Sequence, residues 1–588
     1  MKPNSPRVRS LLVVATTAAM VLLSGALSAL PDSAAPDSAD VKTVNHVLNR
    51  IGFGARPGDI ERVQAMGVEK YINSQLHPEK IADEALKERL APFTTISMSS
   101  SELTDKYFEP ADALRRQRQQ EQARQARTTP VDPTMTTATP ARPPDQPTPE
   151  ERMIQQQQAT VLNELMQAKI LRAVMSERQL DEVLVDFWFN HFNVFVGKGQ
   201  VRQYLTEYER DAIRPYVLGN FRDMLGATAH SPAMLFYLDN FQSVTPNPPP
   251  QRTLFGRGGL RPQPPNAPRG LNENYARELM ELHTLGVDAG YTQKDVQEVA
   301  RVFTGWTIDQ PRLGGRFTFR PQAHDTGTKV VLGTTIENRG ESEGERVLDI
   351  LAKHPATARH IAFKLAQRFV SDEPPKSLVD RAAKKFLDTK GDLREVTRLI
   401  VTSKEFFAKE AYRAKVKTPL EFVVSAARAA GATVQNAQPF VQALRTLGMP
   451  LYGAQPPTGY SMTADAWVNT GALLNRMNFA VQLVSGGQPA GPGGRGGRGV
   501  PNPQQQQRLA NRPLPNPQDM RPAQLARMPI QVDLEMLAPD TTEATRDRLI
   551  QIVLAGEASD ATKATLARAE SPQQLIALTL GSPEFQRR

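Results

Sequence analysis

The sequence predicts a mainly α-helical globular body with one small β-hairpin and disordered insertions rich in proline, glycine and glutamine. Apolar residues recur at helical spacing over most of the chain, and several of these runs begin with a capping motif. The 47 prolines are concentrated in a few stretches, which indicates the insertions. With 588 residues, 40% of them apolar, the chain is long enough for a large buried core.

Residues 1–30 are typical of a bacterial secretory signal peptide. Lys2, Arg7 and Arg9 precede an apolar run from Leu11, and small residues follow near Ala26. The alternative is an uncleaved membrane anchor, because the run approaches the length of a short span. No other segment of the sequence is apolar enough to cross a membrane. We therefore expect a periplasmic or extracellular protein without an integral span after signal cleavage.

Residues 40–486 are expected to form one helical domain. Thr418–Glu421 is a capping box with proline at the first helical position, and Thr292–Asp295 caps a second helix. A longer helical pattern runs over about residues 154–192 and is interrupted near Ser176. These local signals place helix starts and stops without any knowledge of the tertiary contacts.

Three stretches are predicted to be disordered insertions or linkers: residues near 109–150, residues near 244–270, and residues 487–528. The first of them favours a helix at its start, because its prolines begin only at Pro130. The chain after the last stretch, residues 529–588, is expected to form a C-terminal helical extension.

The clearest strand signal lies between the helical segments. Arg316–Arg320 alternates polar and apolar residues, and Lys329–Leu332 contains two β-branched valines. We expect these two segments to pair with each other across the loop at His324–Gly327.

The bulk charge does not indicate a nucleic-acid-binding protein. Of the net charge of +9, residues 1–30 carry +3, residues 244–270 carry +4 and residues 487–528 carry +5, which leaves −3 for the rest. We therefore expect no nucleic-acid partner. The absence of cysteine excludes disulfides, thiolate metal sites and c-type haem attachment.

The segment NENYARELMELHTLG, Asn272–Gly286, contains the strongest candidate site. On a helix, Asn274, Arg277, Glu278 and Glu281 share one face, and apolar residues occupy the other. The two glutamates could hold a divalent cation or divide acid and base roles between them. The alternative is a solvated helix face on which Arg277 pairs with Glu281.

Three further groups could complete such a site. His191 lies in the aromatic run FWFNHFNVF and is either a buried structural donor or a site residue. His324 and Asp325, with Lys329 nearby, are either turn residues or weak metal ligands. His283 falls in the apolar arc of its helix, so we expect it in the core.

Taken together, several motifs resemble the bacterial family catalogued as domain of unknown function 1800, and the resemblance extends over about residues 42–485. The segments that carry it are HVLNRIGFGARPGDIERV from His46, FWFNHF from Phe187, HSPAMLFYLDN from His230, NENYARELMELHTLGVDAGYTQKDVQEVARVFTGWTI from Asn272, HDTGTKVVLG from His324, HPATARHIAFKLAQRFV from His354 and VKTPLEFVV from Val416.

The resemblance implies a mainly helical, usually exported protein, often encoded beside a secreted partner of the family called domain of unknown function 1501. That neighbour resembles sulfatases and alkaline phosphatases in fold. Asn272, Asn274, Arg277, Glu278 and Glu281 all match the family motif.

The chain departs from the family pattern at two places. Phe189 replaces the first histidine of the usual Phe-Trp-His-Asn-His-Phe motif, which weakens any paired-histidine metal site around His191. Tyr460 stands where the family tends to have tryptophan after a glycine. The family often has an aromatic residue at the position of His283, in agreement with a core role for this histidine.

Two functional hypotheses follow from the sequence. The first is an extracytoplasmic binding or assembly module that works with a secreted partner protein, because no complete catalytic constellation is present. The second is a metal-assisted hydrolase of an extracytoplasmic polymer, in which Glu278 and Glu281 hold the cation and His191, or His324 with Asp325, completes the site.

Overall fold

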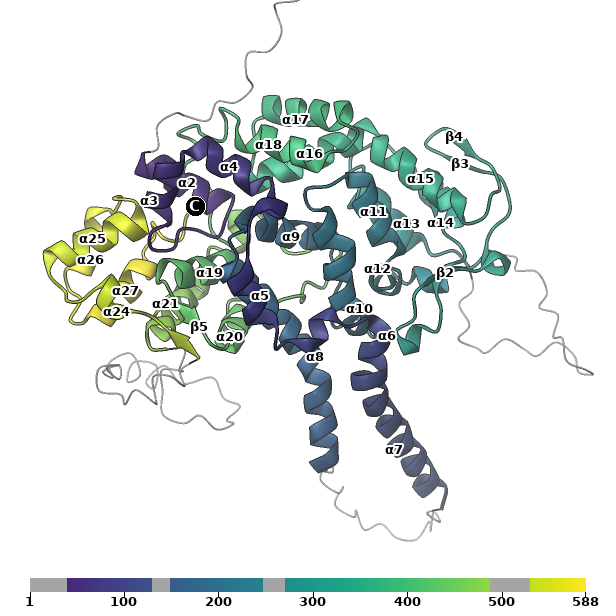
Figure 1. Ribbon diagram of the computed structural model, residues 1–588. Helices are drawn as coiled ribbons and strands as arrows, with labels where there is room; N and C mark the ends of the chain where they lie inside the picture. The colour runs from purple at the N-terminus through teal and green to yellow at the C-terminus, as the bar shows by residue number, and fades with distance from the viewer. Residues whose placement is uncertain (1–39, 129–148, 247–269, 487–528) are drawn as a thin grey trace, which may run out of the picture.

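The computed structural model describes residues 40–128, 149–246, 270–486 and 529–588 (Figure 1). Within them, helices form a body around one large hydrophobic core that draws buried side chains from Val44 through to Phe585. The strands are few and short, so the mainly α-helical fold class is confirmed. The predicted signal peptide and the predicted linker at 487–528 lie outside the described residues.

The N-terminal part consists of short helices joined by tight turns. Asp40 begins the first of them, because its side chain accepts hydrogen bonds from the backbone N–H groups of Lys42 and Thr43. The elements are α2 (Val41–Arg50), α3 (Asp59–Met66), α4 (Val68–Gln75), η1 (Pro78–Lys80), α5 (Glu84–Leu90), η2 (Thr94–Ser97), α6 (Ser100–Leu103) and the π-helical turn η3 (Thr104–Phe108).

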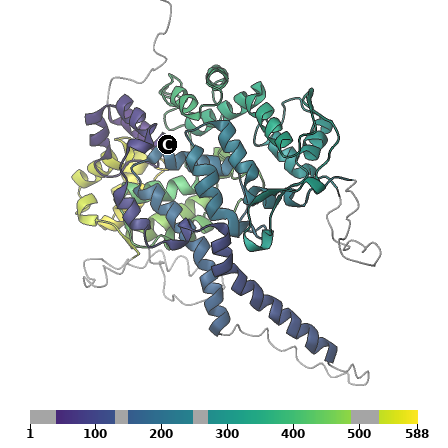
Figure 2. The ribbon, with the colours of Figure 1, turned by 45° about the vertical axis from the view of Figure 1, so that its right-hand side comes forward.

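Two long helices, α7 (Glu109–Thr128) and α8 (Pro149–Met175), project from the body at neighbouring points and diverge outwards (Figures 1 and 2). Helix α7 covers the first part of the predicted insertion at 109–150, so this part is helical, as the absence of proline before Pro130 suggested. Residues 129–148 lie outside the described part of the chain. The inner end of α8 returns to the core, where Leu171 and Val174 are buried.

The central part continues from α8 after a break at Ser176, as predicted. Its elements are α9 (Gln179–His191), α10 (Val201–Glu207), the π-helical turn η4 (Tyr208–Ile213), η5 (Arg214–Tyr216), α11 (Phe221–His230), α12 (Pro232–Tyr237), η6 (Asn240–Gln242), α13 (Glu273–Glu281), α14 (Gln293–Val302), β1 (Trp306–Ile308), η7 (Pro311–Leu313), β2 (Phe317–Phe319), η8 (Pro321–Ala323), β3 (Lys329–Val331), β4 (Thr334–Ile336), α15 (Ser342–Lys353), α16 (Pro355–Phe369), α17 (Lys376–Asp388) and α18 (Leu393–Val401).

The predicted strand pairing is wrong, because each of the two segments pairs with a different partner. β2 pairs antiparallel with β1, and Trp306 lies opposite Phe319. β3 pairs antiparallel with β4, and Lys329 lies opposite Ile336. The indole of Trp306 is fully buried and packs edge-on against Phe317 of β2, which favours the pairing of β2 with β1.

The C-terminal part packs on α8 through α19 and α20. Its elements are α19 (Pro419–Ala429), β5 (Thr433–Val434), α20 (Gln438–Thr446), η9 (Ala464–Ala466), α21 (Thr470–Val484), β6 (Ile530–Gln531), α24 (Leu534–Leu537), α25 (Glu543–Leu554), α26 (Asp560–Leu566) and α27 (Pro572–Gly581). The capping box predicted at Thr418–Glu421 is present at the start of α19, and that at Thr292–Asp295 is present at the start of α14.

Residues 529–588 are joined to the rest of the body rather than set apart from it. β6 pairs with β5, which aligns Ile530 with Val434. α27 packs on α21, and Leu580 and Phe585 belong to the common core.

The predicted insertion at 244–270 begins and ends at one point, where the Val244 N–H donates to the Gly270 carbonyl. Among the described helices, none combines the length and the apolar character that a membrane span requires.

Candidate functional site

Asn272 begins helix α13. Its side-chain oxygen accepts from the backbone N–H groups of Asn274 and Tyr275, at 2.9 and 3.4 Å. Its amide donates to the Leu238 carbonyl at 2.6 Å, which ties the start of α13 to the end of α12. Asn272 is therefore an N-cap that fixes the position of the helix, and the neighbouring Asn274 is exposed.

The acidic face of α13 is partly exposed. The Glu281 carboxylate accepts from the Tyr291 hydroxyl at 3.0 Å. Burial and then the neighbouring Glu281 raise the pKa of Glu278 above its ordinary value. Arg277 does not pair with Glu281 as the surface alternative predicted; its guanidinium donates to Gln293 at 2.8 Å.

His191 lies in the core with two other histidines. It is 6% exposed, and its ring lies 6.4 Å from that of His283 and 6.0 Å from that of His360. Burial and then His360 lower the pKa of His191 well below its ordinary value, and burial lowers that of His283 to about 3. Nε2 of His191 lies 3.2 Å from the His283 carbonyl oxygen, so it acts as a donor. Both rings are buried and neutral, and the core position predicted for His283 is confirmed.

His324 and Lys329 meet at a carboxylate that the sequence analysis did not include, Glu343 at the start of α15. His324 Nε2 lies 3.0 Å from Glu343 Oε1, and Lys329 Nζ lies 2.6 Å from Oε2. Burial opposes ionisation of Glu343, but the hydrogen bonds from His324 and Lys329 hold its pKa below the ordinary value. His324 Nδ1 faces the Thr304 carbonyl at 2.8 Å, so both ring nitrogens are engaged.

Asp325 faces the other way and binds Arg301. The guanidinium of Arg301 donates to both Asp325 oxygens, at 2.9 and 3.1 Å. The predicted pair of His324 and Asp325 is therefore divided between two partners, and each ties the loop between β2 and β3 to a helix.

The structure does not bring the predicted metal ligands together. Glu278 and Glu281 lie on α13, His191 is in the core, and His324 is held by Glu343. In the described part of the chain no three or more histidine, aspartate or glutamate side chains are arranged to hold a metal ion. The convergence that the hydrolase hypothesis requires is therefore not seen among the described residues, where His324 is bound by Glu343 and Asp325 by Arg301.

A different set of residues forms a pocket of about 580 Å³, here called the Arg172 cleft. It lies where the inner end of α8, the start of α9, η5, α5 and α18 approach one another. The residues that line it are Pro78, Glu79, Asp83, Leu86, Lys87, Leu90, Arg172, Arg178, Asp181, Glu182, Arg214, Pro215, Val217, Leu218, Gly219 and Arg394.

An ion network fixes the inner wall of this cleft. The Arg214 guanidinium binds both oxygens of Glu182, at 2.8 and 3.1 Å, and lies 3.3 Å from the buried Glu209. Burial disfavours the charged form of Arg214, but the nearby carboxylates, Glu182 first, raise its pKa above the ordinary value. Glu209 also accepts from the Tyr452 hydroxyl at 2.7 Å, which links the cleft to the core.

Arg172 lies on the same wall, one turn before the end of α8. In contrast to Arg214, its guanidinium forms no hydrogen bond or ion pair with any residue that the structure describes. Burial lowers the pKa of Arg172, and the charge of Arg214 lowers it further, because two cations share one wall. The carboxylates of Glu182 and Glu209 partly offset these effects, so Arg172 is a largely buried cation that lines the pocket without a direct ion pair.

Asp181 lies opposite, in the first turn of α9. Its carboxylate is 3.7 Å from Arg214, too far for a hydrogen bond. Burial and then the adjacent Glu182 raise the pKa of Asp181 to about 7. The cleft therefore combines an unpaired guanidinium with a carboxyl group that changes protonation near neutral pH.

The sequence analysis missed this cleft. One signal was available, since Arg172 interrupts the apolar run KILRAVM on the face of α8 that enters the core. The acidic pair Asp181 and Glu182 follows the helix break, where acidic residues are ordinarily explained by the helix dipole.

Comparison with known proteins places the chain in a family without assigning an activity. No curated protein and no solved structure matches it. The family model described as protein of unknown function (DUF1800) matches residues 46–587, which extends beyond residue 485 to include α24–α27. The chain therefore belongs to this family.

Proposed function

We propose that the protein is a binding module that acts outside the cytoplasm and takes an anionic group of a partner molecule into the Arg172 cleft. The observation that carries this proposal is Arg172, a largely buried guanidinium that lines a pocket of about 580 Å³ and forms no direct hydrogen bond or ion pair with the described residues, although Glu182 and Glu209 act on its charge from further away. A guanidinium binds carboxylate or phosphate through two parallel hydrogen bonds, and the interaction strengthens away from bulk water.

The other polar groups of the cleft support a preorganised binding site. Arg178 donates twice to the Ile81 carbonyl, at 2.9 and 2.7 Å, and Asp83 accepts from the Ser176 hydroxyl at 2.6 Å. Because Glu182 is occupied by Arg214, it does not compete for Arg172. A ligand would therefore meet a fixed wall, which lowers the entropic cost of binding.

The partner in this proposal is a secreted protein or polymer with exposed acidic groups. The signal-like residues 1–30 support a site of action outside the cytoplasm. The first protein to test is a secreted member of the family called domain of unknown function 1501, because the family resemblance implies that such proteins are often encoded nearby. Cell fractionation with N-terminal sequencing of the mature protein tests the export.

The binding experiment compares the wild-type protein with Arg172→Gln, and uses Arg346→Gln as the matched control because Arg346 is exposed on α15. Calorimetric titration with phosphate, citrate and polyglutamate should show saturable binding. We expect Arg172→Gln to weaken it by about 10- to 100-fold, since hydrogen bonds to charged groups contribute roughly 1.5–3 kcal/mol. If Arg172→Gln bound these anions as tightly as Arg346→Gln does, the proposal would be wrong.

Hydrolysis of a polymer is the second candidate, and Asp181 is the observation that favours it. A carboxyl group with a pKa of about 7 is suited to donate or accept a proton at neutral pH. This version does not use the cation site predicted on α13. If it holds, the hydrolysis rate of an acidic polysaccharide or peptide should depend on pH with an inflection near 7, and Asp181→Asn should abolish the activity.

A further inference from the structure

A second, separate feature lies where the chain before α19 meets the C-terminal segment, since the Lys417 N–H donates to the Gln586 carbonyl. Six cationic side chains are buried there within the described structure, each no more than 5% exposed. They are Arg50, Arg368, Lys415, Lys417, Arg476 and Arg588.

The carboxylates at this place are too few to balance these charges. Glu421 lies 2.9 Å from both Arg368 and Arg588, and Asp372 is the ion partner of Lys415. These two acids are fewer than the basic groups, and burial lowers the pKa of Lys417 and that of Arg588 well below their ordinary values, because uncompensated positive charge is costly in a low-dielectric interior. The Nε atoms of Arg50, Arg476 and Arg588 are also buried without a hydrogen-bond acceptor in the described residues.

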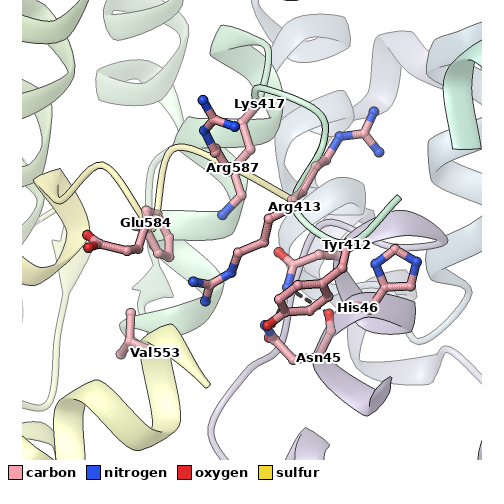
Figure 3. A pocket seen from close by; sticks show the side chains of 11 residues that line it. Asn45, His46, Tyr412, Arg413, Lys417, Val553, Glu584 and Arg587 are labelled. Atoms are coloured by element: carbon pink, nitrogen blue, oxygen red, sulfur yellow. Dashed lines mark hydrogen bonds between the residues drawn. The ribbon is translucent and has the colours of Figure 1, made fainter. Parts of the chain in front are cut away.

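At the edge of this cluster a small pocket is present (Figure 3). Its volume of about 10 Å³ matches one water-sized particle. The residues that line it are Asn45, His46, Asn49, Tyr412, Arg413, Lys417, Val553, Glu584, Phe585, Arg587 and Arg588.

Lys417 is the residue that points to a ligand. It is 3% exposed, and its amine forms no hydrogen bond or ion pair with the residues that the structure describes. Its nearest aromatic contact is the ring of Phe585, whose centroid lies 3.7 Å from Nζ. Figure 3 shows the Arg413 guanidinium directed toward Val553, in agreement with its hydrogen bond to the Leu554 carbonyl, so Arg413 is already engaged.

The other groups around the pocket do not supply the missing counter-ion. The Glu584 carboxylate accepts from the Ser559 backbone N–H and the Thr562 hydroxyl and so caps α26. Arg413 is 3.3 Å from Glu557, outside the pocket lining. Burial lowers the pKa of His46 to about 3, so this ring adds no charge at neutral pH.

We propose that this pocket binds a small monovalent inorganic anion of about the size of chloride, held by the Lys417 amine and the Arg588 guanidinium. The pocket volume excludes phosphate, citrate and peptide carboxylates, so this site is distinct from the Arg172 cleft. The anion stabilises the charged form of Lys417, which burial disfavours, and fixes the chain before α19 to the C-terminal segment.

The test uses the whole protein, purified without halide, and follows its melting temperature during titration with sodium chloride or bromide. Sodium gluconate keeps the ionic strength constant. For the wild-type protein we expect a saturable rise on the order of 1–2 °C. Lys417→Met should remove the halide response, whereas Lys409→Met, which changes an exposed lysine, should retain it. A response of the same size in Lys417→Met would overturn the proposal.

Crystals of the wild-type protein grown in bromide give an independent test that does not require a stable variant. We expect an anomalous bromide peak in contact with the Lys417 amine. Well-ordered crystals with no peak in this pocket would overturn the proposal even if the variant failed to fold.

Discussion

Arg172 and Arg214 share one wall of the same cleft, and of the two only Arg214 has carboxylate partners within the described chain. Arg214 is held by Glu182 and Glu209, so its charge is part of the folded framework. Arg172 is close enough to be affected by the charge of Arg214 but has no partner of its own. This asymmetry separates a structural arginine from one that is available to a ligand.

The first prediction concerns the stability of these two arginine variants. Arg214→Met should lower the free energy of unfolding by about 3–5 kcal/mol, because it leaves two buried carboxylates without a partner. Arg172→Met should leave the stability unchanged or raise it, because it removes an uncompensated charge. Urea unfolding of both variants measures the difference. Equal losses would show that Arg172 has a structural partner.

The second prediction concerns the pH dependence that Asp181 introduces. Its folded-state pKa of about 7 is above its ordinary value of 3.8, so the folded state binds the proton more tightly than the unfolded state does. The wild-type protein should therefore lose stability as pH rises from about 4 to about 7, by about 1–3 kcal/mol, and stay lower above that range. Asp181→Asn lacks this group.

The measurement is the difference between the unfolding free energies of Asp181→Asn and wild type as a function of pH. The unfolding free energy of Asp181→Asn relative to that of wild type should increase as the pH rises from about 4 to about 7, and it should stay constant at higher pH. A difference that does not change with pH would contradict the raised pKa.

Local features of the fold could be predicted from the sequence, whereas contacts between distant segments could not. The capping boxes at Thr292 and Thr418 depend on residues three positions away, and both form. The pairing of Phe319 with Trp306 depends on the burial of an indole outside the segment considered. The strand character of both segments was therefore recognised, but their partners were not.

The candidate site shows the same limit more strongly. His324 and Lys329 were recognised as a polar group, but Glu343, which binds both, lies on a helix after two intervening strands. Arg172 and Arg214 are separated by the whole of α9 and α10, and nothing in either local sequence shows which one has a carboxylate partner. Charge pairing of this kind is decided by tertiary packing.

The third prediction tests the buried pair of Glu343 and Lys329, both of which have fully buried side chains. Glu343→Leu should cost about 3–5 kcal/mol of unfolding free energy, because the Lys329 charge is left unpaired. The double variant Glu343→Leu, Lys329→Met should recover much of this loss. Urea unfolding of the single and double variants gives the coupling energy.

The exposed pair of Lys384 and Asp388 is the control, with side chains 76% and 55% exposed. Asp388→Asn should change the stability by less than about 1 kcal/mol. Additive losses in the Glu343 and Lys329 cycle would mean that the two charges do not depend on each other.

The fourth prediction concerns divalent cations at the acidic face of α13. Glu278 and Glu281 are neighbours, and Glu281 contributes to the raised pKa of Glu278, but no third ligand side chain joins them in the described structure. Two carboxylates on a partly exposed face bind calcium or magnesium weakly, because six or more oxygen ligands are usual for these ions. We therefore expect calcium, magnesium, manganese or zinc to shift the melting temperature of the wild type no more than that of Glu278→Gln, Glu281→Gln. A metal-specific rise that only the double variant loses would restore the cation site.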